Sequence, residues 1–234
     1  MDFAERTQLL IGDEGVKRLS EARVLVVGVG GVGAFAAEMI CRAGVGHITL
    51  VDSDTVKPSN INRQLPALHS TIGKYKVDLL ADRFKDINPD VEIVAIKEFL
   101  DDSNLEQIMS ESFDYVIDAI DSITPKVHLI EYCLKNKVRI ISSMGAGGRL
   151  DPSKVQIADI SKTYQCTLAR TVRERLKKDG ITKGLRVVFS SEVVRKESVI
   201  EVKDEKCKRS TTGTISYIPA VFGCYLASEV ISKI

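Results

Sequence analysis

The sequence lacks the features that define several large classes of protein. Its five cysteines are an odd number and form no Cys-x-x-Cys pair, which argues against a structural zinc site or a disulfide framework and favours reduced thiols. Lysine and arginine number 33 and aspartate and glutamate 32, so no net field of one sign directs the chain to nucleic acid or to a membrane. Any basic surface must therefore be local.

Long uninterrupted apolar runs are also missing. The first residues, MDFAERTQLLIGDEG, contain acids and no extended apolar core, so they predict no secretory signal. The apolar stretch ISYIPAVFGCYLASEVISKI is interrupted by Pro219, Ser228 and Glu229 and stays below the ~20 apolar residues that a membrane span needs. We expect a packed terminal helix, no association with a membrane and a cytoplasmic protein.

Strand and helix patterns alternate over the first two thirds of the chain. Short β-branched and apolar runs predict strands, and stretches with apolar residues three and four apart predict helices between them. Such alternation is typical of an α/β fold with a Rossmann-like, doubly wound, mainly parallel sheet. The predicted strands cover 23–27, 48–51, 91–96, 113–121 and 138–143, and the predicted helices cover 34–42, 75–87, a short segment around Leu105, and 125–137.

The pattern changes after Gly148. The segments VQIAD, RVVFSSEVV and SVIEV predict three strands, with a single helix at 168–178 between the first and the second. Because these strands lack regular crossover helices, we expect an antiparallel C-terminal extension of the sheet. All of 1–234 is predicted to form one domain, with a charged, turn-rich and mobile loop at 203–213.

Four glycines stand where the first predicted strand ends and the next helix begins. Gly28, Gly30, Gly31 and Gly33 lie in the segment VVGVGGVGAFAAE. Glycines let the backbone turn tightly and approach phosphate, and the free N–H groups of a helix N-terminus attract anions. Asp52 ends the next strand, where a carboxylate can accept the hydroxyl groups of a ribose. The pattern predicts a nucleotide site but leaves NAD, FAD and ATP open.

Further polar residues favour a triphosphate. Cleavage of a nucleoside triphosphate at its α-phosphorus needs cationic donors around the phosphates and a carboxylate for a divalent cation. Asp118 and Asp121 lie at the carboxyl end of the fourth predicted strand, the edge where ligands bind in doubly wound sheets. The other candidate site residues are Asp54, Asn60, Arg63, Gln64 and Lys76.

Together these motifs resemble the ATP-binding signature of the ubiquitin-activating-type adenylating enzymes, the ThiF-, MoeB- and HesA-like family. The resemblance rests on GVGGVG, on D-x-D at 52–54, on N-x-x-R-Q at 60–64, on GKYK at 73–76 and on DAIDS at 118–122. It implies that Asp121 holds Mg²⁺ (magnesium), that Arg63 and Lys76 grip the phosphates of ATP, and that Asp52 binds the ribose. Asp54 and Asn60 are implied as further site residues.

The resemblance also implies a reaction and an assembly. A carboxylate attacks the α-phosphorus of ATP, pyrophosphate leaves and an acyl-adenylate remains, with Arg63, Lys76 and Asp121 as catalytic residues. Arg6, in the segment RTQLLIG, resembles an N-terminal arginine that reaches the ATP of the partner subunit. Arg6 is therefore a fourth catalytic candidate and implies a homodimer.

The second half of the chain resembles one branch of this family. The segments GAGGRLDPSKVQIADISKT, LARTVRERLKK and VVFSSEVV are similar to those of the tRNA threonylcarbamoyladenosine dehydratases. The resemblance implies that the threonyl carboxylate of a modified adenosine next to the anticodon is adenylated. The carbamoyl group of the same nucleoside then closes a ring, with release of AMP and pyrophosphate. The implied partner is tRNA, not DNA.

A basic helix gives this partner local support. The apolar residues of 168–178 form one stripe and leave its arginines and lysines outward, a pattern that suits RNA phosphates but is more often a solvated helix face. Tyr164 is a candidate for stacking on a base, although packing is the commoner role. The basic residues in question are Arg170, Arg173, Lys177 and Lys178, with Lys206, Lys208 and Arg209 in the loop.

Two alternatives stay open at this stage. One is adenylation of the C-terminal glycine of a ubiquitin-like sulfur-carrier protein. Many enzymes of that branch have two Cys-x-x-Cys zinc pairs and some have a catalytic cysteine; the pairs are missing here, and Cys166 lies in the corresponding region without any signal of reactivity. The other is a nucleotide-binding module without chemistry, or an NAD enzyme.

Overall fold

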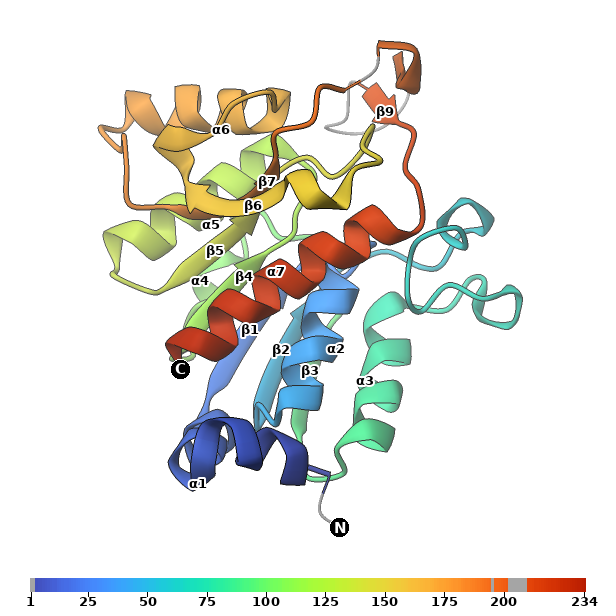
Figure 1. The fold of residues 1–234 in the computed structure, drawn as a ribbon, viewed down its shortest axis with the longest axis vertical. Helices are drawn as coiled ribbons and strands as arrows, with labels where there is room; N and C mark the ends of the chain where they lie inside the picture. The colour runs from blue at the N-terminus through green and yellow to red at the C-terminus, as the bar shows by residue number, and fades with distance from the viewer. Residues whose placement is uncertain (1–2, 195, 202–209) are drawn as a thin grey trace.

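The computed structural model describes residues 3–194, 196–201 and 210–234, which form a seven-stranded sheet with helices on both faces (Figure 1). The strand order is β3-β2-β1-β4-β5-β7-β6. Every neighbouring pair is parallel except β6 and β7, so the predicted doubly wound α/β fold with an antiparallel extension is confirmed. The strands are β1 (Arg23–Val27), β2 (His47–Val51), β3 (Glu92–Ile96), β4 (Tyr115–Asp118), β5 (Ile140–Ser143), β6 (Val155–Asp159) and β7 (Arg186–Ser190).

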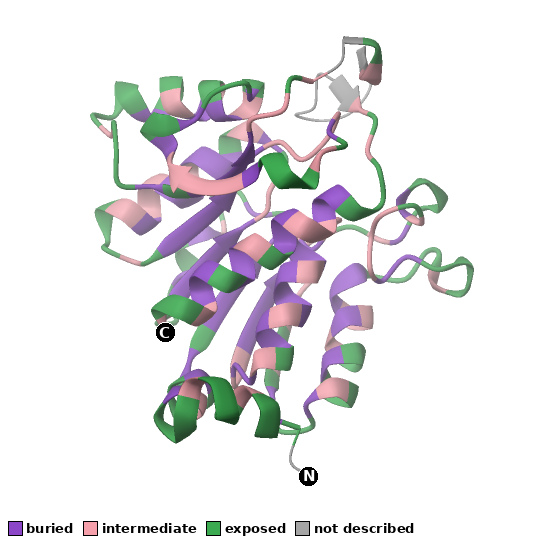
Figure 2. Cartoon of the chain, viewed as in Figure 1, coloured by how far each residue is buried: buried purple, intermediate pink, exposed green. Residues whose placement is uncertain are grey.

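The central strands are buried on both faces because apolar residues occupy consecutive positions along them (Figure 2). In β1, Val24 and Val26 belong to one hydrophobic core and Leu25 and Val27 to the other. The first core packs under α2 (Gly33–Ala43), α3 (Lys76–Ile87) and α7 (Tyr217–Lys233). The second packs under α4 (Leu105–Ile108), α5 (Ile123–Lys135) and α6 (Thr167–Lys178).

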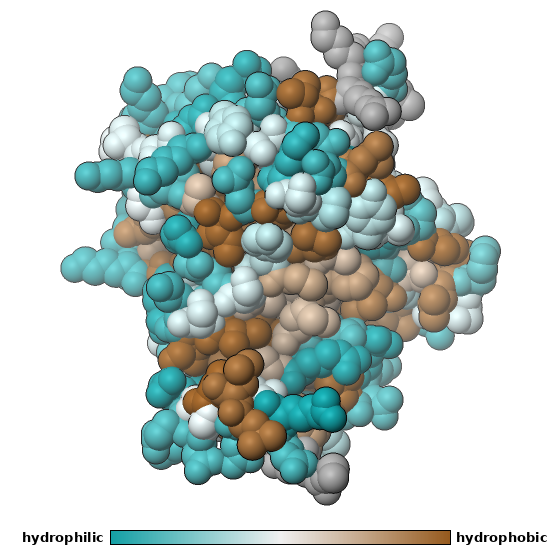
Figure 3. Space-filling model, viewed as in Figure 1, coloured by the Kyte–Doolittle hydropathy of each residue, from teal (hydrophilic) through white to brown (hydrophobic). Residues whose placement is uncertain are grey.

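Helix α7 packs along α2, as predicted for a terminal helix buried against the domain. The contact is close at Gly223, where a β-carbon would lie 2.6 Å from the carbonyl oxygen of Val32. Figure 3 shows apolar and small residues over the middle of this face, where α2 and α7 lie, with polar residues around them. Within the described residues, no helix is both long and apolar enough to cross a membrane.

The structure refines one prediction for the second half and corrects another. The antiparallel extension of the sheet consists of β6 alone, because β7 pairs parallel with β5. The predicted strand SVIEV does not extend the sheet, because β8 (Val199–Glu201) pairs with β9 (Ser210–Thr212) in a separate two-stranded ribbon. Of the loop predicted at 203–213, residues 203–209 lie outside the described residues, and β9 occupies most of the remainder.

The sequence patterns did not predict the first helix, α1 (Glu5–Glu21). It bends at Gly12, whose φ of 74° lies in the left-handed region that only glycine adopts readily. Of its side chains only Leu19 is buried, whereas Leu9 and Leu10 are 84% and 85% exposed. The helix therefore packs little of its apolar surface on its own chain.

Candidate functional site

The glycine loop between β1 and α2 has the shape that a phosphate-binding turn requires. Gly28 has a φ of 85°, and a β-carbon there would lie 2.8 Å from the carbonyl oxygen of Ala119. A β-carbon on Gly33 would lie 1.8 Å from the carbonyl oxygen of Gly28, so larger residues are excluded by sterics at both positions. The N–H of Ala34 donates to the carbonyl oxygen of Gly30, but no side chain caps the start of α2, so no side chain competes with an anion for this helix N-terminus.

Asp52 is fixed against this loop from the end of β2. One carboxylate oxygen accepts the N–H of Val29 at 2.8 Å, and the other accepts the N–H of Asp54 at 2.8 Å. Burial raises the pKa of Asp52, and the nearby Lys76 opposes this shift. The structure thus places Asp52 beside the glycines, as predicted for a ribose-binding acid.

Lys76 and Asp54 form an ion pair across the loop that follows β2. The Nζ atom of Lys76 lies 2.7 Å from Oδ2 of Asp54. Lys76 is 3% exposed, but the Asp54 side chain is 58% exposed, so the pair lies at the border between protein and solvent. Both predicted residues are therefore together, with the ammonium group held in position by the carboxylate.

The predicted N-x-x-R-Q motif forms a turn beside the glycine loop. The 3-10 helix η1 (Pro58–Asn60) begins it, and the side chain of Asn60 accepts the N–H of Lys57 at 3.0 Å. Asn60 is 8% exposed and therefore shapes the turn from inside. Arg63 donates to the carbonyl oxygen of Ser59 at 2.8 Å, which orients its guanidinium group.

Gln64 lies against the glycine loop. Its Nε2 would lie 3.6 Å from a β-carbon on Gly30, and its Oε1 is buried without a hydrogen-bond donor in the described part of the chain. The backbone and side chain of Arg63 lie about as close to Gly31. Because a buried acceptor without a donor is unfavourable, the unpaired oxygen fits a ligand that brings a donor to this turn.

The two acids after β4 have different environments. Asp118 is 0% exposed, and its Oδ2 lies 2.6 Å from Nζ of Lys126, which is also 0% exposed. Lys126 donates in addition to Ser142 and to the carbonyl oxygen of Ser143 on β5. Asp118 therefore holds the end of β4 to α5 and β5, and the structure does not place it on the surface of the site, where a cofactor-binding role was predicted.

Asp121, by contrast, is exposed at the carboxyl end of β4, the position predicted for a metal ligand. No group of three His, Cys, Asp or Glu residues that could hold a metal occurs in the ranges the structure describes. The carboxylate of Asp121 is of the type that binds Mg²⁺, which is commonly held by one or two carboxylates together with the phosphates of a substrate.

Lys126 is a site-supporting residue that the sequence patterns missed. The sequence contains one signal of this role. Lys126 follows Asp118 by eight residues and lies in the first turn of the helix that packs on the same strand. The pattern at 125–137 by itself predicts only a helix. Burial of a lysine at 0% exposure could be recognised only once α5 was placed on β4 and β5.

Arg6 lies apart from the other predicted site residues. It is exposed on α1, which leads into the amino end of β1, whereas the glycine loop follows the carboxyl end (Figure 1). The structure therefore does not bring Arg6 to the site of its own chain.

The region around α6 supports only part of the basic surface that was predicted. Arg170, Lys177 and Lys178 are exposed, but Arg173 is half-buried and donates to the carbonyl oxygen of Thr163 at 2.9 Å. Arg173 thus serves the local fold and does not project freely into solvent. The lysines and arginine predicted at 206–209 lie outside the described residues.

Cys166 is 8% exposed and packs against the side chain of Arg149. A thiol with so little access is poorly placed to receive an acyl group, so we expect Cys166→Ser to retain turnover within about threefold. The measurement is steady-state kinetics beside Cys224→Ser, a change at an exposed cysteine. A loss above a hundredfold with intact ATP binding would instead place the thiol in the chemistry.

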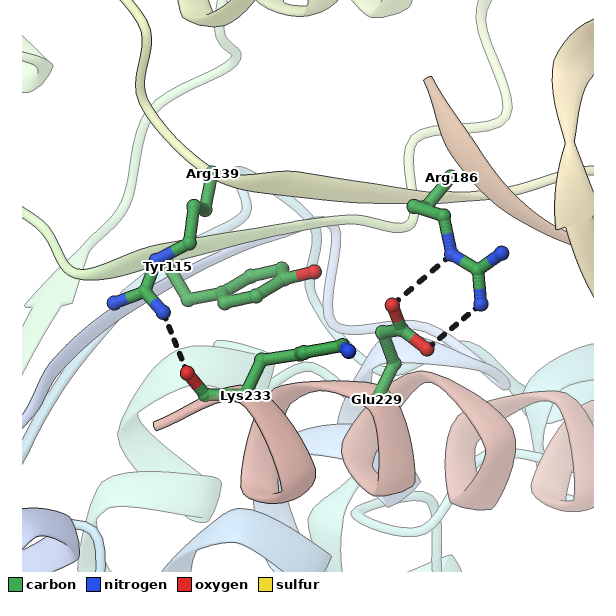
Figure 4. Close-up of a pocket in the computed structure, with 5 residues that line it drawn as sticks. All are labelled: Tyr115, Arg139, Arg186, Glu229 and Lys233. Carbon is green, nitrogen blue, oxygen red and sulfur yellow. Dashed lines mark hydrogen bonds and ion pairs between the residues drawn. The ribbon is translucent and has the colours of Figure 1, made fainter. Parts of the chain in front are cut away.

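A pocket of about 460 Å³ lies at the opposite end of the strands (Figure 4). Tyr115 and Arg186 are the first residues of β4 and β7, so this pocket is at the amino end of the sheet. Arg186 forms two 3.0 Å hydrogen bonds with Glu229, and Arg139 donates to the carbonyl oxygen of Lys233. Burial raises the pKa of Tyr115 to about 12. These contacts hold α7 against the sheet. The pocket is separate from the candidate site, which lies at the carboxyl end of the strands.

Comparison with known proteins decides the family. A sequence model of the ThiF family matches residues 4–234. The chain belongs to the ThiF family. The resemblance carried by the glycine loop and the polar motifs is thereby confirmed.

Several relatives of this ThiF-family chain match it over nearly its whole length. The tRNA threonylcarbamoyladenosine dehydratase of Bacillus subtilis is 46% identical over 97% of this chain and 92% of the relative. The crystal structure of Escherichia coli tRNA N6-threonylcarbamoyladenosine dehydratase in complex with ATP matches with a TM-score of 0.90 at 38% identity, over 98% of this chain and 92% of that one. The molybdopterin-synthase adenylyltransferase of Escherichia coli is 37% identical over a smaller part, 59% of this chain and 54% of the relative.

Proposed function

We propose that this protein is an ATP-dependent tRNA threonylcarbamoyladenosine dehydratase that acts in the cytoplasm. The observation that carries the proposal is the 46% identity to the Bacillus subtilis dehydratase, which includes the second half of the chain as well as the nucleotide loop. The geometry agrees, because the glycine loop, Asp52, Lys76 and Asp121 gather at the carboxyl edge of the sheet. In this proposal, ATP and the modified adenosine of tRNA react with each other at one site.

The described side chains divide the work on ATP among them. The glycine loop and the N-terminus of α2 receive phosphate oxygens, and Asp52 accepts from the ribose. Arg63 and Lys76 neutralise charge as the bond between the α- and β-phosphates breaks. Asp121 would hold Mg²⁺, which would supply charge neutralisation for the leaving pyrophosphate. The buried Asp118–Lys126 pair keeps the loop that carries Asp121 in place.

The reaction needs no general base in its first step. The threonyl carboxylate is already a nucleophile, so its oxygen attacks the α-phosphorus and pyrophosphate leaves. The carbamoyl group of the same nucleoside then attacks the activated carbonyl carbon, and AMP leaves with the carboxylate oxygen. The ring closes with net loss of water from the nucleoside. Because the acceptor is intramolecular, an enzyme thiol is unnecessary, in agreement with the burial of Cys166.

Mass spectrometry of nucleosides tests the proposal directly. Threonylcarbamoylated tRNA is incubated with the protein, ATP and Mg²⁺, and the digested nucleosides are examined for a loss of one water. Absence of this product beside an active control enzyme would refute the proposal. Exchange of pyrophosphate into ATP that depends on a sulfur-carrier protein, and not on tRNA, would favour the carrier-activating function instead.

The position of Arg6 supports a homodimer. It is exposed on α1 at the amino end of β1, and the same helix exposes Leu9 and Leu10, an apolar surface that a second copy would bury. We propose that Arg6 of one subunit reaches the ATP phosphates in the other.

Arg6→Ala should therefore inactivate the enzyme without unfolding it. In mixtures, dimers of Arg6→Ala and Arg63→Ala subunits should recover about a quarter to a half of wild-type activity, because one of the two sites is then intact. Turnover across a titration of the two variants measures this. Failure to complement would show that Arg6 does not act across the subunit interface.

A further inference from the structure

One corner of the carboxyl edge of the sheet is not used by the ATP site. The segment 163–166 leads into α6 and lies beside the loop that follows β5. The Sγ atom of Cys166 and the Cβ atom of Leu168 would be 3.6 and 3.9 Å from a β-carbon on Gly145. Because β5 is the neighbour of β4, this corner is on the same edge as Asp121, on the side away from the glycine loop.

An exposed aromatic ring stands at this corner. Tyr164 is 55% exposed, and its ring meets the ring of Phe189 edge-on, with centroids 5.6 Å apart. The contact with β7 anchors the ring, and the exposed remainder is open to solvent. An anchored, exposed aromatic side chain has the form of a platform for a nucleic acid base.

Two arginines hold the backbone on both sides of Tyr164. Arg173 donates to the carbonyl oxygen of Thr163 at 2.9 Å, and Arg149 donates to that of Gln165 at 2.9 Å. Gln165 has a φ of 51°, in the left-handed region that residues other than glycine rarely adopt. The segment is thus kept in an uncommon conformation that presents the tyrosine.

The same corner contains a buried cation. Arg149 is 2% exposed, and its Nη1 is buried without an acceptor among the described residues. The charge of Glu192 acts on Arg149, but the carboxylate of Glu192 accepts the backbone N–H groups of Leu150 and Asp151. A buried cation with weak compensation favours an anion nearby.

This cation lies at the start of α6. Its guanidinium group contacts Cys166, the residue that precedes the helix, and no side chain caps the 12-residue helix. The first N–H groups of α6 add to the charge of Arg149 here, and Arg170, in the first turn of the helix, is exposed. An aromatic ring beside a site for one anion matches the base and the phosphate of one nucleotide.

We propose that this corner binds one nucleotide of the tRNA that flanks the modified adenosine. Its base stacks on Tyr164, and its phosphate lies at the N-terminus of α6, in the field of Arg149 and beside Arg170. The inference rests on the proposed function, and it names the part of the chain that orients the single-stranded RNA toward Asp121.

The test uses tRNA with 2-aminopurine at the nucleotide on either side of the modified adenosine. Stacking on Tyr164 changes the fluorescence of the analogue on binding. We expect Tyr164→Ala to abolish this change at one of the two positions and to raise the Kd and the KM for tRNA about 10-fold, within the range for loss of one stacked base. The KM for ATP and kcat should stay within about twofold, and Tyr164→Phe should behave as wild type.

Two further variants test the specificity of these effects. One removes an exposed aromatic ring elsewhere on the protein, and the other removes a charge beside the proposed phosphate site. Phe99→Ala removes a 49% exposed aromatic ring beyond β3, at the opposite edge of the sheet, and should leave tRNA binding unchanged. Arg170→Gln should lower the slope of log Kd against log salt concentration by about one.

The outcomes distinguish this inference from the proposed function. Wild-type protein that cyclises the nucleoside, together with a Tyr164→Ala variant of unchanged tRNA Kd and fluorescence, would overturn the inference alone. Wild-type protein without cyclisation would refute the proposed function, and the fluorescence titration, which needs no turnover, would still decide whether Tyr164 stacks on RNA. Binding of a sulfur-carrier protein, but not of tRNA, that depends on Tyr164 would also overturn it.

Discussion

Replacing Asp121 with alanine should abolish turnover and weaken ATP binding only about tenfold. Asp121 is exposed at the carboxyl end of β4, where in the proposed reaction its carboxylate would hold Mg²⁺ and so help to neutralise the leaving pyrophosphate. Charge on the pyrophosphate grows as the bond breaks, so the interaction is stronger in the transition state than in the ground state. We expect kcat to fall roughly 10³-fold or more, by analogy with removal of other electrostatic groups from active sites.

The measurement combines single-turnover cyclisation of tRNA with calorimetric titration of ATP. Asp90→Ala is a matched control, because Asp90 is an exposed aspartate before β3, at the amino end of the sheet. This control should behave as wild type in both assays. Equal losses of ATP affinity and of kcat in Asp121→Ala would contradict a role centred on the transition state.

The second large effect concerns stability. Lys126→Met should lower the free energy of unfolding by about 3–5 kcal/mol, because it leaves the carboxylate of Asp118 buried without its cation. The pair is 0% exposed on both sides, and its nitrogen and oxygen are 2.6 Å apart. Urea denaturation followed by circular dichroism gives the free energy of unfolding.

Two comparisons make this prediction specific. The double variant Asp118→Leu/Lys126→Met removes both charges and should recover much of the loss, because no unpaired buried charge remains. Lys97→Met breaks the half-exposed pair with Asp78 and should cost about 1 kcal/mol or less. If Lys126→Met lowers the free energy of unfolding by less than 1 kcal/mol, then water or a local movement must stabilise the carboxylate of Asp118 in place of the lysine.

The elements of the first half were predictable because their signals are local. The glycine loop lies between a β-branched run and a helix pattern, and its spacing to Asp52 is fixed by one strand–helix–strand unit. The direction of β7 was not predictable, because it depends on which existing strand offers free backbone groups at the edge of the sheet. That edge is created by residues distant in the sequence.

The sequence by itself therefore determined the α/β class, the family, the nucleotide loop and the candidate residues that a ligand would touch. Those signals depend on residue type and spacing within one structural unit. Only the tertiary structure decided that Asp118 is buried in an ion pair with Lys126 and that Arg149 is buried with an unpaired Nη1. It also decided that Tyr164 is exposed beside α6. Burial, pairing and exposure depend on which segments pack together. Contacts between residues far apart in the chain leave no signal in the local sequence.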